Sequence, residues 1–340
     1  MVEKIRTIQL GCGPIGCEVA KLALQRNYIQ LVGAVDIDPQ KEGQDLGQLL
    51  GIEKKLGMVI TDNIEALLTQ EKPDLVFHTT CSELNQVYAQ LKLLLEAQVN
   101  VVSTCEELSF PYTKSPNLAA ELNQLAKSNQ VSLLATGINP GFLMDTWPLC
   151  MTAVCQHVQK IKVVRIQDAS LRRMPFQKKI GAGLSPEEFQ QQANQGTIRH
   201  VGLEESAAMI ASGLGWDLSK ITEEIHPVIA PEQLRTQQLD IPAGFAAGVK
   251  QVAHGYLEAD EKITLEFQAF IKAPESYDAI YITGIPSLKV VIPGGVHGDL
   301  GTAAVVVNAA SKVVNATAGL LTMKDIPLVN WTTGSTNLGI

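Results

Sequence analysis

Two adjacent acidic side chains with the right chemistry for proton transfer follow a short apolar segment of the sequence. The segment reads NVVSTCEELSFP, so Glu106 and Glu107 come directly after a run of β-branched residues. A carboxylate can accept a proton from a reacting group and return it later in the reaction. Neighbouring residues of an extended chain point to opposite sides. We therefore expect one glutamate to face a cleft and the other to face solvent or cap a turn, and a fully solvated pair is the alternative.

A glycine cluster near the N-terminus predicts a dinucleotide site. In IRTIQLGCGPIGCEVAKLALQ, the glycines Gly11, Gly13 and Gly16 separate an apolar run from an amphipathic one. A second predicted strand ends in Asp36, twenty residues beyond Gly16. The order strand, GxGxxG, helix and acidic residue is the dinucleotide fingerprint, whereas a turn without a ligand is the alternative.

Each part of this motif has an expected role. Gly11 permits the tight turn, Gly13 lets the pyrophosphate approach, and Gly16 lets helix and strand pack closely. Pro14 and Ile15 open the helix, whose free N–H groups would receive the phosphates. Asp36 would accept hydrogen bonds from the ribose hydroxyls and disfavour a 2′-phosphate, which favours NAD and leaves NADP possible.

Other polar residues follow further predicted strands. They lie in His78-Thr79-Thr80, in Ser103-Thr104-Cys105 and in the segment from Thr136 to Phe142. Ligands of open α/β sheets bind beyond the carboxyl ends of the strands. We expect Thr79, Thr80 and Thr104 beside the cofactor and Asn139 in the substrate pocket. Cys105 has no identifiable base beside it, so we interpret it as a packing residue.

The elements that must position these residues fall into two groups. Apolar strands and amphipathic helices alternate over about the first 140 residues, which predicts a doubly wound parallel sheet of the Rossmann type. From Gly141 onward longer amphipathic strands, such as EKITLEFQAFIK and YDAIYITGIPSLKVVI, predict a second α/β domain on a mixed, mainly antiparallel sheet. The expected domains are 1–142, completed by a C-terminal helix at 301–340, and 143–300. The apolar segment TAAVVVNAASKVVNATAGLL should be helical and pack on the first domain.

Composition excludes several classes of protein. The net charge of −8 over 340 residues argues against a nucleic-acid partner or an anionic membrane. No stretch is apolar enough to span a bilayer or serve as a signal peptide. The six cysteines form no CxxC pair and no zinc-ligand cluster is visible, so we expect reduced thiols, no metal and a cytoplasmic location.

Several motifs together resemble one family. The glycine turn, STCEELSFP, GINPGF, DASLRRMPFQKKIGAG, RHVGLEES and GGVHGDLGTAAVVVNA are similar to those of the 2,4-diaminopentanoate dehydrogenases and related native amine dehydrogenases, within the dihydrodipicolinate-reductase-like group. The resemblance covers nearly the whole chain. It implies NAD(P)-dependent, reversible oxidative deamination of a small amine to a ketone and ammonia, and a homodimer formed mainly by the second domain.

The resemblance also implies roles for individual residues. The catalytic glutamate would be Glu106 or Glu107, and the pocket would include Phe142, Trp147, His200 and Thr302. Core packing is the alternative for the two aromatic residues, and a surface position is the alternative for the histidine. The segment RRMPFQKK contains a basic cluster that could bind a substrate carboxylate, and a solvated surface is the alternative. The residues of this cluster are Arg172, Arg173, Lys178 and Lys179.

The sequence permits two other functions. A related enzyme would reduce a cyclic imine without added ammonia. The paired histidines and the Lys-x-Asp-x-Pro-Ser-Gly-Thr segment of dihydrodipicolinate reductases are, however, missing from the sequence. A non-catalytic dinucleotide-sensing module would need no acid–base residue, and it would usually carry a DNA-binding or effector segment.

Overall fold

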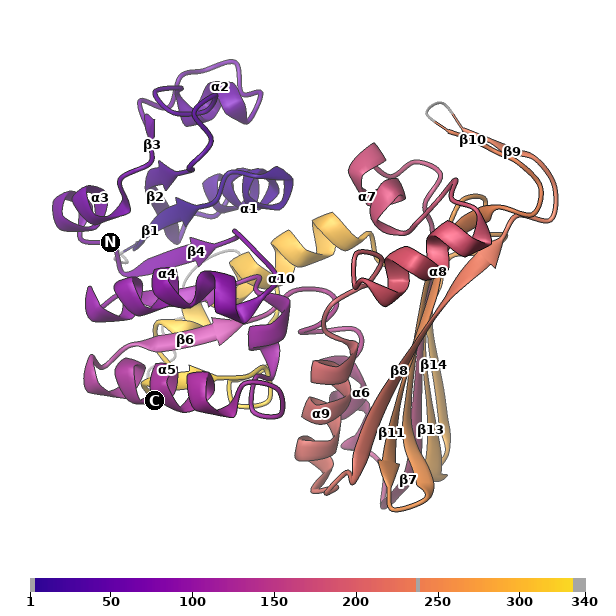
Figure 1. The fold of residues 1–340 in the computed structure, drawn as a ribbon. Helices are drawn as coiled ribbons and strands as arrows, with labels where there is room; N and C mark the ends of the chain where they lie inside the picture. Colours follow the sequence, from indigo (N-terminus) through magenta and orange to yellow (C-terminus); the bar gives the residue numbers. More distant parts are fainter. Residues whose placement is uncertain (1–3, 237–238, 333–340) are drawn as a thin grey trace. The chain divides into compact units, whose positions relative to one another are not determined.

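The computed structural model describes residues 4–236 and 239–332, which divide into two compact units (Figure 1). Unit 1 contains the described residues up to Phe142 and from His297 onward. Unit 2 contains Leu143–Val296. The chain therefore leaves unit 1 once and returns to it for its last helix.

Unit 1 is built on a seven-stranded sheet in the order β15-β6-β5-β4-β1-β2-β3, in which every pair of neighbouring strands is parallel. This arrangement confirms the Rossmann-type prediction. The strands are β1 (Ile5–Leu10), β2 (Ile29–Val35), β3 (Ile60–Thr61), β4 (Leu75–His78), β5 (Asn100–Ser103), β6 (Ser132–Ala135) and β15 (Gly319–Leu321).

Helices cover both faces of this sheet because its strands are apolar on both sides. One face carries Ile8, Val76 and Val101, which form a core with the apolar stripes of α4 and α5. The other face is covered by α1, which packs against α10. The helices of unit 1 are α1 (Pro14–Leu24), α2 (Leu46–Leu49), α3 (Ile64–Glu71), α4 (Leu84–Glu96), η1 (Glu106–Ser109, a 3₁₀ helix), α5 (Pro116–Ser128) and α10 (Gly298–Val313).

The C-terminal segment of unit 1 differs from its prediction. The segment TAAVVVNAASKVVNATAGLL is not one helix, because α10 ends at Val313 and the chain forms strand β15 at Gly319–Leu321. Beyond the helix end, the Asn315 side chain donates to the Ser311 carbonyl, and Gly319 has a φ of +146° that interrupts helical geometry. The predicted helix at 301–340 is therefore helical only up to Val313, and residues 333–340 lie outside the described residues.

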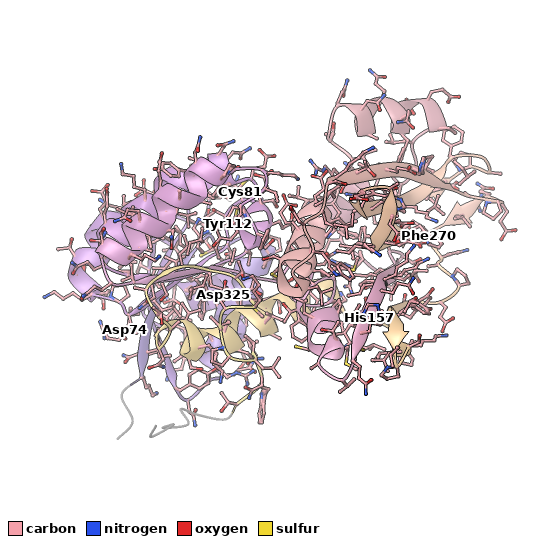
Figure 2. All side chains as sticks on the ribbon, turned by 90° about the horizontal axis from the view of Figure 1, so that it is seen from below. Asp74, Cys81, Tyr112, His157, Phe270 and Asp325 are labelled. Carbon is pink, nitrogen blue, oxygen red and sulfur yellow. The ribbon has the colours of Figure 1, made fainter. Side chains whose placement is uncertain are left out.

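Polar contacts within unit 1 fix the end of β15, and two of the residues that make them, Tyr112 and Asp325, are labelled in Figure 2. The Tyr112 hydroxyl donates to the Leu320 carbonyl at 3.3 Å. Asp325 accepts from both the backbone N–H and the hydroxyl of Thr322, at 2.9 and 2.6 Å. These contacts hold the last strand beside β6.

Unit 2 contains a six-stranded mixed sheet in the order β14-β13-β7-β12-β11-β8, in which only β12 and β7 are parallel among the paired strands. The prediction of a mainly antiparallel second sheet is therefore confirmed. YDAIYITGIPSLKVVI forms two strands rather than one, because Pro286 follows β13 and the chain turns there into β14. The strands are β7 (His157–Asp168), β8 (Lys220–Ile229), β11 (Ala246–Leu257), β12 (Asp260–Phe270), β13 (Tyr277–Ile285) and β14 (Leu288–Pro293), with a separate pair β9 (Leu234–Arg235) and β10 (Asp240–Ile241).

One face of this sheet forms the core of unit 2 with helix α9. Val163, Leu265 and Ile280 point into it, and Phe267 lies in the same core. A capping box at Ser185 and Glu188 starts one of the other helices. The helices of unit 2 are α6 (Thr146–Thr152), α7 (Met174–Lys179), α8 (Pro186–Asn194) and α9 (Leu203–Leu214). Over residues 4–236 and 239–332, no helix is both long and apolar enough to cross a membrane.

Candidate active site

The predicted functional residues of unit 1 gather at one edge of its sheet. Parallel backbone hydrogen bonding continues at the first residue after β1, β4 and β5. The N–H groups of Gly11, Thr79 and Thr104 donate to the carbonyls of Val35, Leu10 and His78, at 2.8, 2.8 and 2.9 Å. Because all strands are parallel, these turns share the carboxyl edge, where open α/β sheets bind ligands.

The glycine turn is tightly packed at two of its three glycines. Gly11 has a φ of +88°, and a side chain there would place its Cβ 2.5 Å from the Thr79 carbonyl oxygen. A Cβ at Gly16 would lie 1.9 Å from the carbonyl oxygen of Gly11. The Thr79 hydroxyl donates to that same oxygen at 2.8 Å, and the Gln9 amide also donates to it at 2.8 Å. The fold itself therefore requires glycine at positions 11 and 16.

Gly13 is different, because a Cβ added there would meet no atom within 4 Å. Packing against other protein atoms therefore does not explain why this residue is a glycine. Gly13 is the N-cap residue of α1, has no capping side chain, and is followed by Pro14 and the half-buried Ile15. The first N–H groups of a helix have no partner within it and attract anions. The open space before them fits the pyrophosphate of a dinucleotide.

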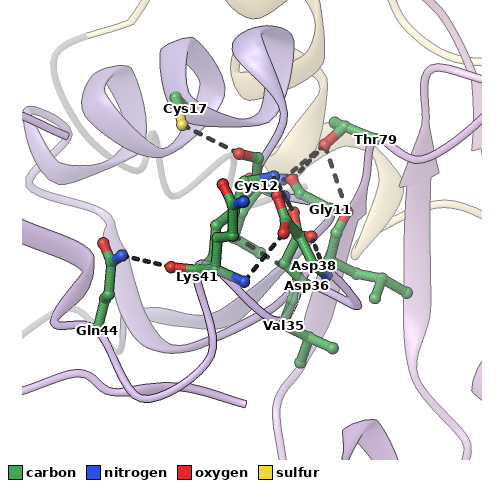
Figure 3. A network of polar contacts seen from close by, with 12 residues as sticks. Gly11, Cys12, Cys17, Val35, Asp36, Asp38, Lys41, Gln44 and Thr79 are labelled. Atoms are coloured by element: carbon green, nitrogen blue, oxygen red, sulfur yellow. Dashed lines mark hydrogen bonds and ion pairs between the residues drawn. The ribbon is translucent and has the colours of Figure 1, made fainter. Parts of the chain in front are cut away.

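Asp36 fixes the adjacent part of the site (Figure 3). Its Oδ2 accepts the Cys12 N–H at 2.7 Å, and its Oδ1 accepts the Asp38 N–H at 2.9 Å. Burial raises the pKa of Asp36, but the hydrogen bonds from Asp38, Lys41 and Cys12 outweigh burial and lower that pKa overall. Ile37, the next residue, is 83% exposed, so an apolar surface lies open beside this carboxylate.

The remaining threonines occupy different environments. Thr79 is buried and holds the glycine turn, whereas Thr80 is exposed and donates its hydroxyl to Gln90 at 3.0 Å. Thr104 is half-buried at the end of β5. The Thr302 hydroxyl, on α10, accepts the Ile138 N–H at 3.3 Å, which places α10 beside the loop that carries Asn139.

The two glutamates begin the 3₁₀ helix η1 instead of continuing an extended strand. The expected alternation therefore does not apply, but their surroundings still differ. Glu107 Oε2 accepts the Leu84 N–H at 2.8 Å, at the start of α4, and the Glu107 N–H donates to the Ser82 carbonyl at 3.1 Å. Glu107 thus caps a turn, as expected for one member of the pair. Glu106 is half-buried, and its Oε2 is a buried atom.

A buried histidine supports the turn that carries the glutamates. His78 Nδ1 lies 2.8 Å from the Ser103 hydroxyl oxygen, and that oxygen accepts the Cys105 N–H at 3.0 Å. The other ring nitrogen lies 2.9 Å from Gln90 Oε1. Burial strongly raises the pKa of the Cys105 thiol, so it stays protonated and agrees with a packing role.

Asn139 is a buried polar residue with unmet hydrogen-bonding capacity. It is 5% exposed, and neither its amide nitrogen nor its amide oxygen has a hydrogen-bond partner among the described residues. Leaving buried polar atoms unpaired is costly, so such atoms in a folded protein call for an explanation. A ligand that donates and accepts at this edge of the sheet would supply one.

The remaining pocket candidates divide between the units. Phe142 is half-buried at the end of unit 1. Trp147, on α6, is half-buried and packs against the core of unit 2. Its assignment to a substrate pocket stays a prediction, because core packing accounts for this position.

His200 is half-buried in unit 2, so it lies neither in the closed core nor fully at the surface. Its ring packs edge-on against that of Phe267, with 4.6 Å between the ring centroids, and its backbone N–H donates to Gln251 Oε1 at 2.8 Å. Nδ1 lies 2.9 Å from the Val201 carbonyl oxygen, which can only accept, so Nδ1 carries the proton. Burial, with a smaller effect from the nearby cation Lys179, lowers the pKa of His200 to about 3. His200 is therefore neutral at physiological pH.

The basic segment RRMPFQKK forms helix α7 and the loop before it. The Arg172 guanidinium stacks on the Phe176 ring at 4.2 Å. Gln177 anchors the loop by donating to the carbonyls of Ala169 and Arg172, at 2.9 and 3.1 Å. Arg173, Lys178 and Lys179 are exposed, in agreement with the solvated alternative. Within the described part of the chain, no cluster of His, Cys, Asp and Glu residues could hold a metal ion.

Sequence reasoning did not assign a role in this site to two of its residues, Lys41 and His78. Lys41 contacts Asp36, but the turn between the two residues has an unremarkable composition that does not indicate this contact. His78 was visible only as part of a strand end. Its contact with Ser103 joins residues 25 positions apart, which sequence spacing does not predict.

The buried histidine of unit 1 makes stability depend on pH. Burial lowers the pKa of His78 from 6.5 to about 4. Between these values the unfolded chain binds a proton and the folded chain does not, so the free energy of unfolding falls as the pH drops below about 6.5. From pH 7 to pH 5 this single group should cost about 2 kcal/mol.

The measurement is urea unfolding at pH 7 and pH 5, followed by circular dichroism. His78→Gln should show a smaller loss of stability between these pH values than the wild-type protein. His226→Gln, which changes an exposed histidine, is the matched control and should keep the wild-type loss. An equal loss in the His78 and His226 variants would contradict the assignment.

The glycine turn, the fixed Asp36 and the carboxylate beyond β5 define an NAD(P)-dependent dehydrogenase on a Rossmann domain. The sequence model of the 2,4-diaminopentanoate dehydrogenase C-terminal domain matches residues 142–338, and that of the dihydrodipicolinate reductase N-terminus matches residues 5–109. The chain belongs to the 2,4-diaminopentanoate dehydrogenase family. Its likeness to the reductases lies in the nucleotide-binding part.

Individual relatives agree with this assignment. The chain is 33% identical to 2,4-diaminopentanoate dehydrogenase from Acetoanaerobium sticklandii over 339 residues, which cover 96% of this chain and 94% of the relative. It is 24% identical to an amine dehydrogenase from Streptomyces virginiae, with 95% and 96% covered. An amine dehydrogenase structure from Mycobacterium smegmatis shares the fold, with a TM-score of 0.87 at 24% identity over 98% of this chain and 99% of that one.

Proposed function

We propose that the protein catalyses the reversible oxidative deamination of a small amine to a ketone and ammonia, through an iminium intermediate. The amine is similar to 2,4-diaminopentanoate or is a simple alkyl amine. One observation carries the proposal. Glu106 lies just beyond β5, at the same sheet edge as the glycine turn. The 33% identity to a 2,4-diaminopentanoate dehydrogenase supports it.

In the direction of amination, the carboxylate of Glu106 takes a proton from ammonium and releases NH₃. The NH₃ attacks the ketone carbon to form a carbinolamine. Glu106 then returns its proton to the departing hydroxyl, water leaves, and an iminium ion remains. A carboxylate also stabilises this cation electrostatically. A bound NADH or NADPH would supply the hydride that reduces it to the amine.

Glu106 is the better candidate because Glu107 has another role. The Glu107 carboxylate accepts an N–H group at the start of α4, and its own backbone N–H is bonded to the Ser82 carbonyl. A carboxylate that is hydrogen-bonded at the start of a helix cannot rotate freely toward a substrate. We therefore assign proton transfer to Glu106 and turn stabilisation to Glu107.

Asn139 is proposed to bind the reacting ligand through its carboxamide. The unmet donors and acceptor of this buried side chain support the assignment. Phe142, Trp147 and Thr302 remain proposed substrate contacts. His200, if it contacts substrate, would act as a hydrogen-bond acceptor through Nε2, since its Nδ1 is protonated and its pKa is far below neutrality.

The proposed function is tested with a panel of carbonyl substrates. The purified protein is mixed with NADH or NADPH, ammonium and either a small alkyl ketone or one of the amino-oxopentanoates that deamination of 2,4-diaminopentanoate would give. Consumption of the reduced coenzyme that requires both ketone and ammonium is the expected result, with the amine confirmed by mass spectrometry.

The same assay separates the alternatives. Turnover of a cyclic imine without ammonium would replace the proposal with an imine reductase. Dinucleotide binding without turnover of any carbonyl or imine would favour a sensing module. We also infer a cytoplasmic location, which the six free thiols support and which cell fractionation would test.

We further propose a homodimer formed by the second sheet. Val164, Ala279 and Val291 are neighbours across three strands, on the face opposite the core that contains Val163 and Ile280. Val291 is 40% exposed there. The resemblance to the family supports a dimer contact through this sheet.

Light scattering at micromolar concentration should therefore give twice the mass of one chain. Val291→Glu should shift the protein toward the monomer, because the contact would bury an unpaired charge. Val154→Glu is the matched control, since Val154 is 64% exposed in the turn before β7. A monomeric wild-type protein, or equal effects of the two variants, would overturn this surface.

A further inference from the structure

A lysine lies beside the carboxylate that is proposed to receive the ribose. The ammonium nitrogen of Lys41 is 3.0 Å from Asp36 Oδ2 and 3.5 Å from Asp38 Oδ2 (Figure 3). Its side chain is only 23% exposed, and that of Asp36 is 10% exposed. The contact is therefore partly shielded from water, where charge interactions are stronger than at an open surface.

The position of this lysine is set by the turn after β2. The Lys41 N–H donates to the Asp38 carbonyl at 2.9 Å, and the Asp38 side chain accepts the Gln40 N–H at 3.0 Å. The turn thus brings the ammonium group back toward the end of the strand. There it faces Asp36, whose two oxygens are already held by the N–H groups of Cys12 and Asp38.

We propose that Lys41 sets the coenzyme preference by providing the cation that admits the 2′-phosphate of NADP(H). This inference rests on the proposed dinucleotide site. In Rossmann domains the acidic residue after the second strand contacts the ribose 2′-hydroxyl, which is where NADP carries its extra phosphate. That phosphate has nearly two negative charges. The carboxylates of Asp36 and Asp38 repel it and Lys41 attracts it, so NAD(H) is preferred while NADP(H) is still accepted.

A purely structural role for Lys41 would predict a different result. If the lysine only held Asp36 in place for the ribose, its removal would weaken NAD and NADP binding alike. If it contacts the phosphate, its removal affects NADP almost alone. The ratio of the two dissociation constants therefore distinguishes a specificity residue from a structural one.

The experiment is calorimetric titration of NAD⁺ and NADP⁺ into four proteins: wild type, Lys41→Met, Asp36→Ala and the double variant. Lys41→Met should weaken NADP⁺ binding by about tenfold or more, the value of one charge-assisted hydrogen bond, and NAD⁺ binding by less than about threefold. Asp36→Ala should strengthen NADP⁺ binding about tenfold, because it removes a repelling charge and releases Lys41. The double variant should lose that gain.

Lys92→Met provides the control, since Lys92 is an exposed residue of α4 whose ion pair with Glu96 is a local one. It should leave both affinities unchanged. An unchanged ratio of the NADP⁺ and NAD⁺ dissociation constants in Lys41→Met would overturn the role of Lys41 but not the dinucleotide site. Equal NADP⁺ affinities in Asp36→Ala and the double variant would do the same. A wild-type protein that binds neither coenzyme overturns the dinucleotide site and this inference together.

Discussion

Replacing Gly13 by valine should lower the affinity for NAD⁺ by about a hundredfold or more and leave the protein folded. The valine side chain would occupy the open space before α1, where the pyrophosphate is expected. Displacing the phosphates removes at least two charge-assisted hydrogen bonds from N–H groups, which corresponds to a loss of this order. Because an added Cβ meets no protein atom within 4 Å, the fold should tolerate the change.

Calorimetric titration and thermal unfolding together check this prediction. Gly13→Ala should have a smaller effect on binding than Gly13→Val, in proportion to the space filled. Gly16→Ala is the contrasting variant, because its Cβ would collide with the Gly11 carbonyl at 1.9 Å and should lower the stability of the protein itself. Wild-type NAD⁺ affinity in a folded Gly13→Val protein would remove the glycine turn from the cofactor site.

The sequence predicted the nucleotide-binding half well, for a physical reason. A parallel sheet covered on both faces needs continuous apolar strands and intervening amphipathic helices, and both patterns are local. Once the strands are parallel, their carboxyl ends share one edge. The positions of Gly11, Asp36, Thr79 and Glu106 at this edge follow from topology alone.

Features that depend on contacts distant in sequence were not predictable. Nothing in Glu106-Glu107 distinguishes the two residues, and only the N–H of Leu84, 23 positions before Glu107, gives one of them a capping role. The end of α10 at Val313 was missed because the apolar pattern continues into β15, whose residues are buried by pairing with β6. Helix and strand segments that are buried on all sides have similar composition.

The environment of Asn139 illustrates a further limit. Its residue type permits many roles, and its position after β6 suggests a ligand only through topology. Burial of the side chain without a hydrogen-bond partner is what makes it a strong candidate, and burial is a property of the folded chain. The same holds for His200, for which the sequence context favoured a surface position over a pocket.

The two glutamates should respond very differently to the same substitution. Glu106→Gln keeps the size of the side chain but removes the group that accepts and returns a proton. The rate of reductive amination should fall by about a hundredfold or more, the usual contribution of a general acid–base group. The dissociation constant for NAD⁺, measured by titration, should stay near the wild-type value, because the phosphate and ribose contacts are made by other residues.

Glu107→Gln is the matched control, since it changes the same functional group one residue away. A glutamine oxygen can still accept the Leu84 N–H that Glu107 accepts at 2.8 Å, so the turn and the rate should both be nearly preserved. A large loss in Glu107→Gln with none in Glu106→Gln would reverse the assignment. If both variants keep the full rate across the pH range, neither glutamate transfers the proton. The neutral ring of His200 is then the next group to test, by His200→Asn and the same assay.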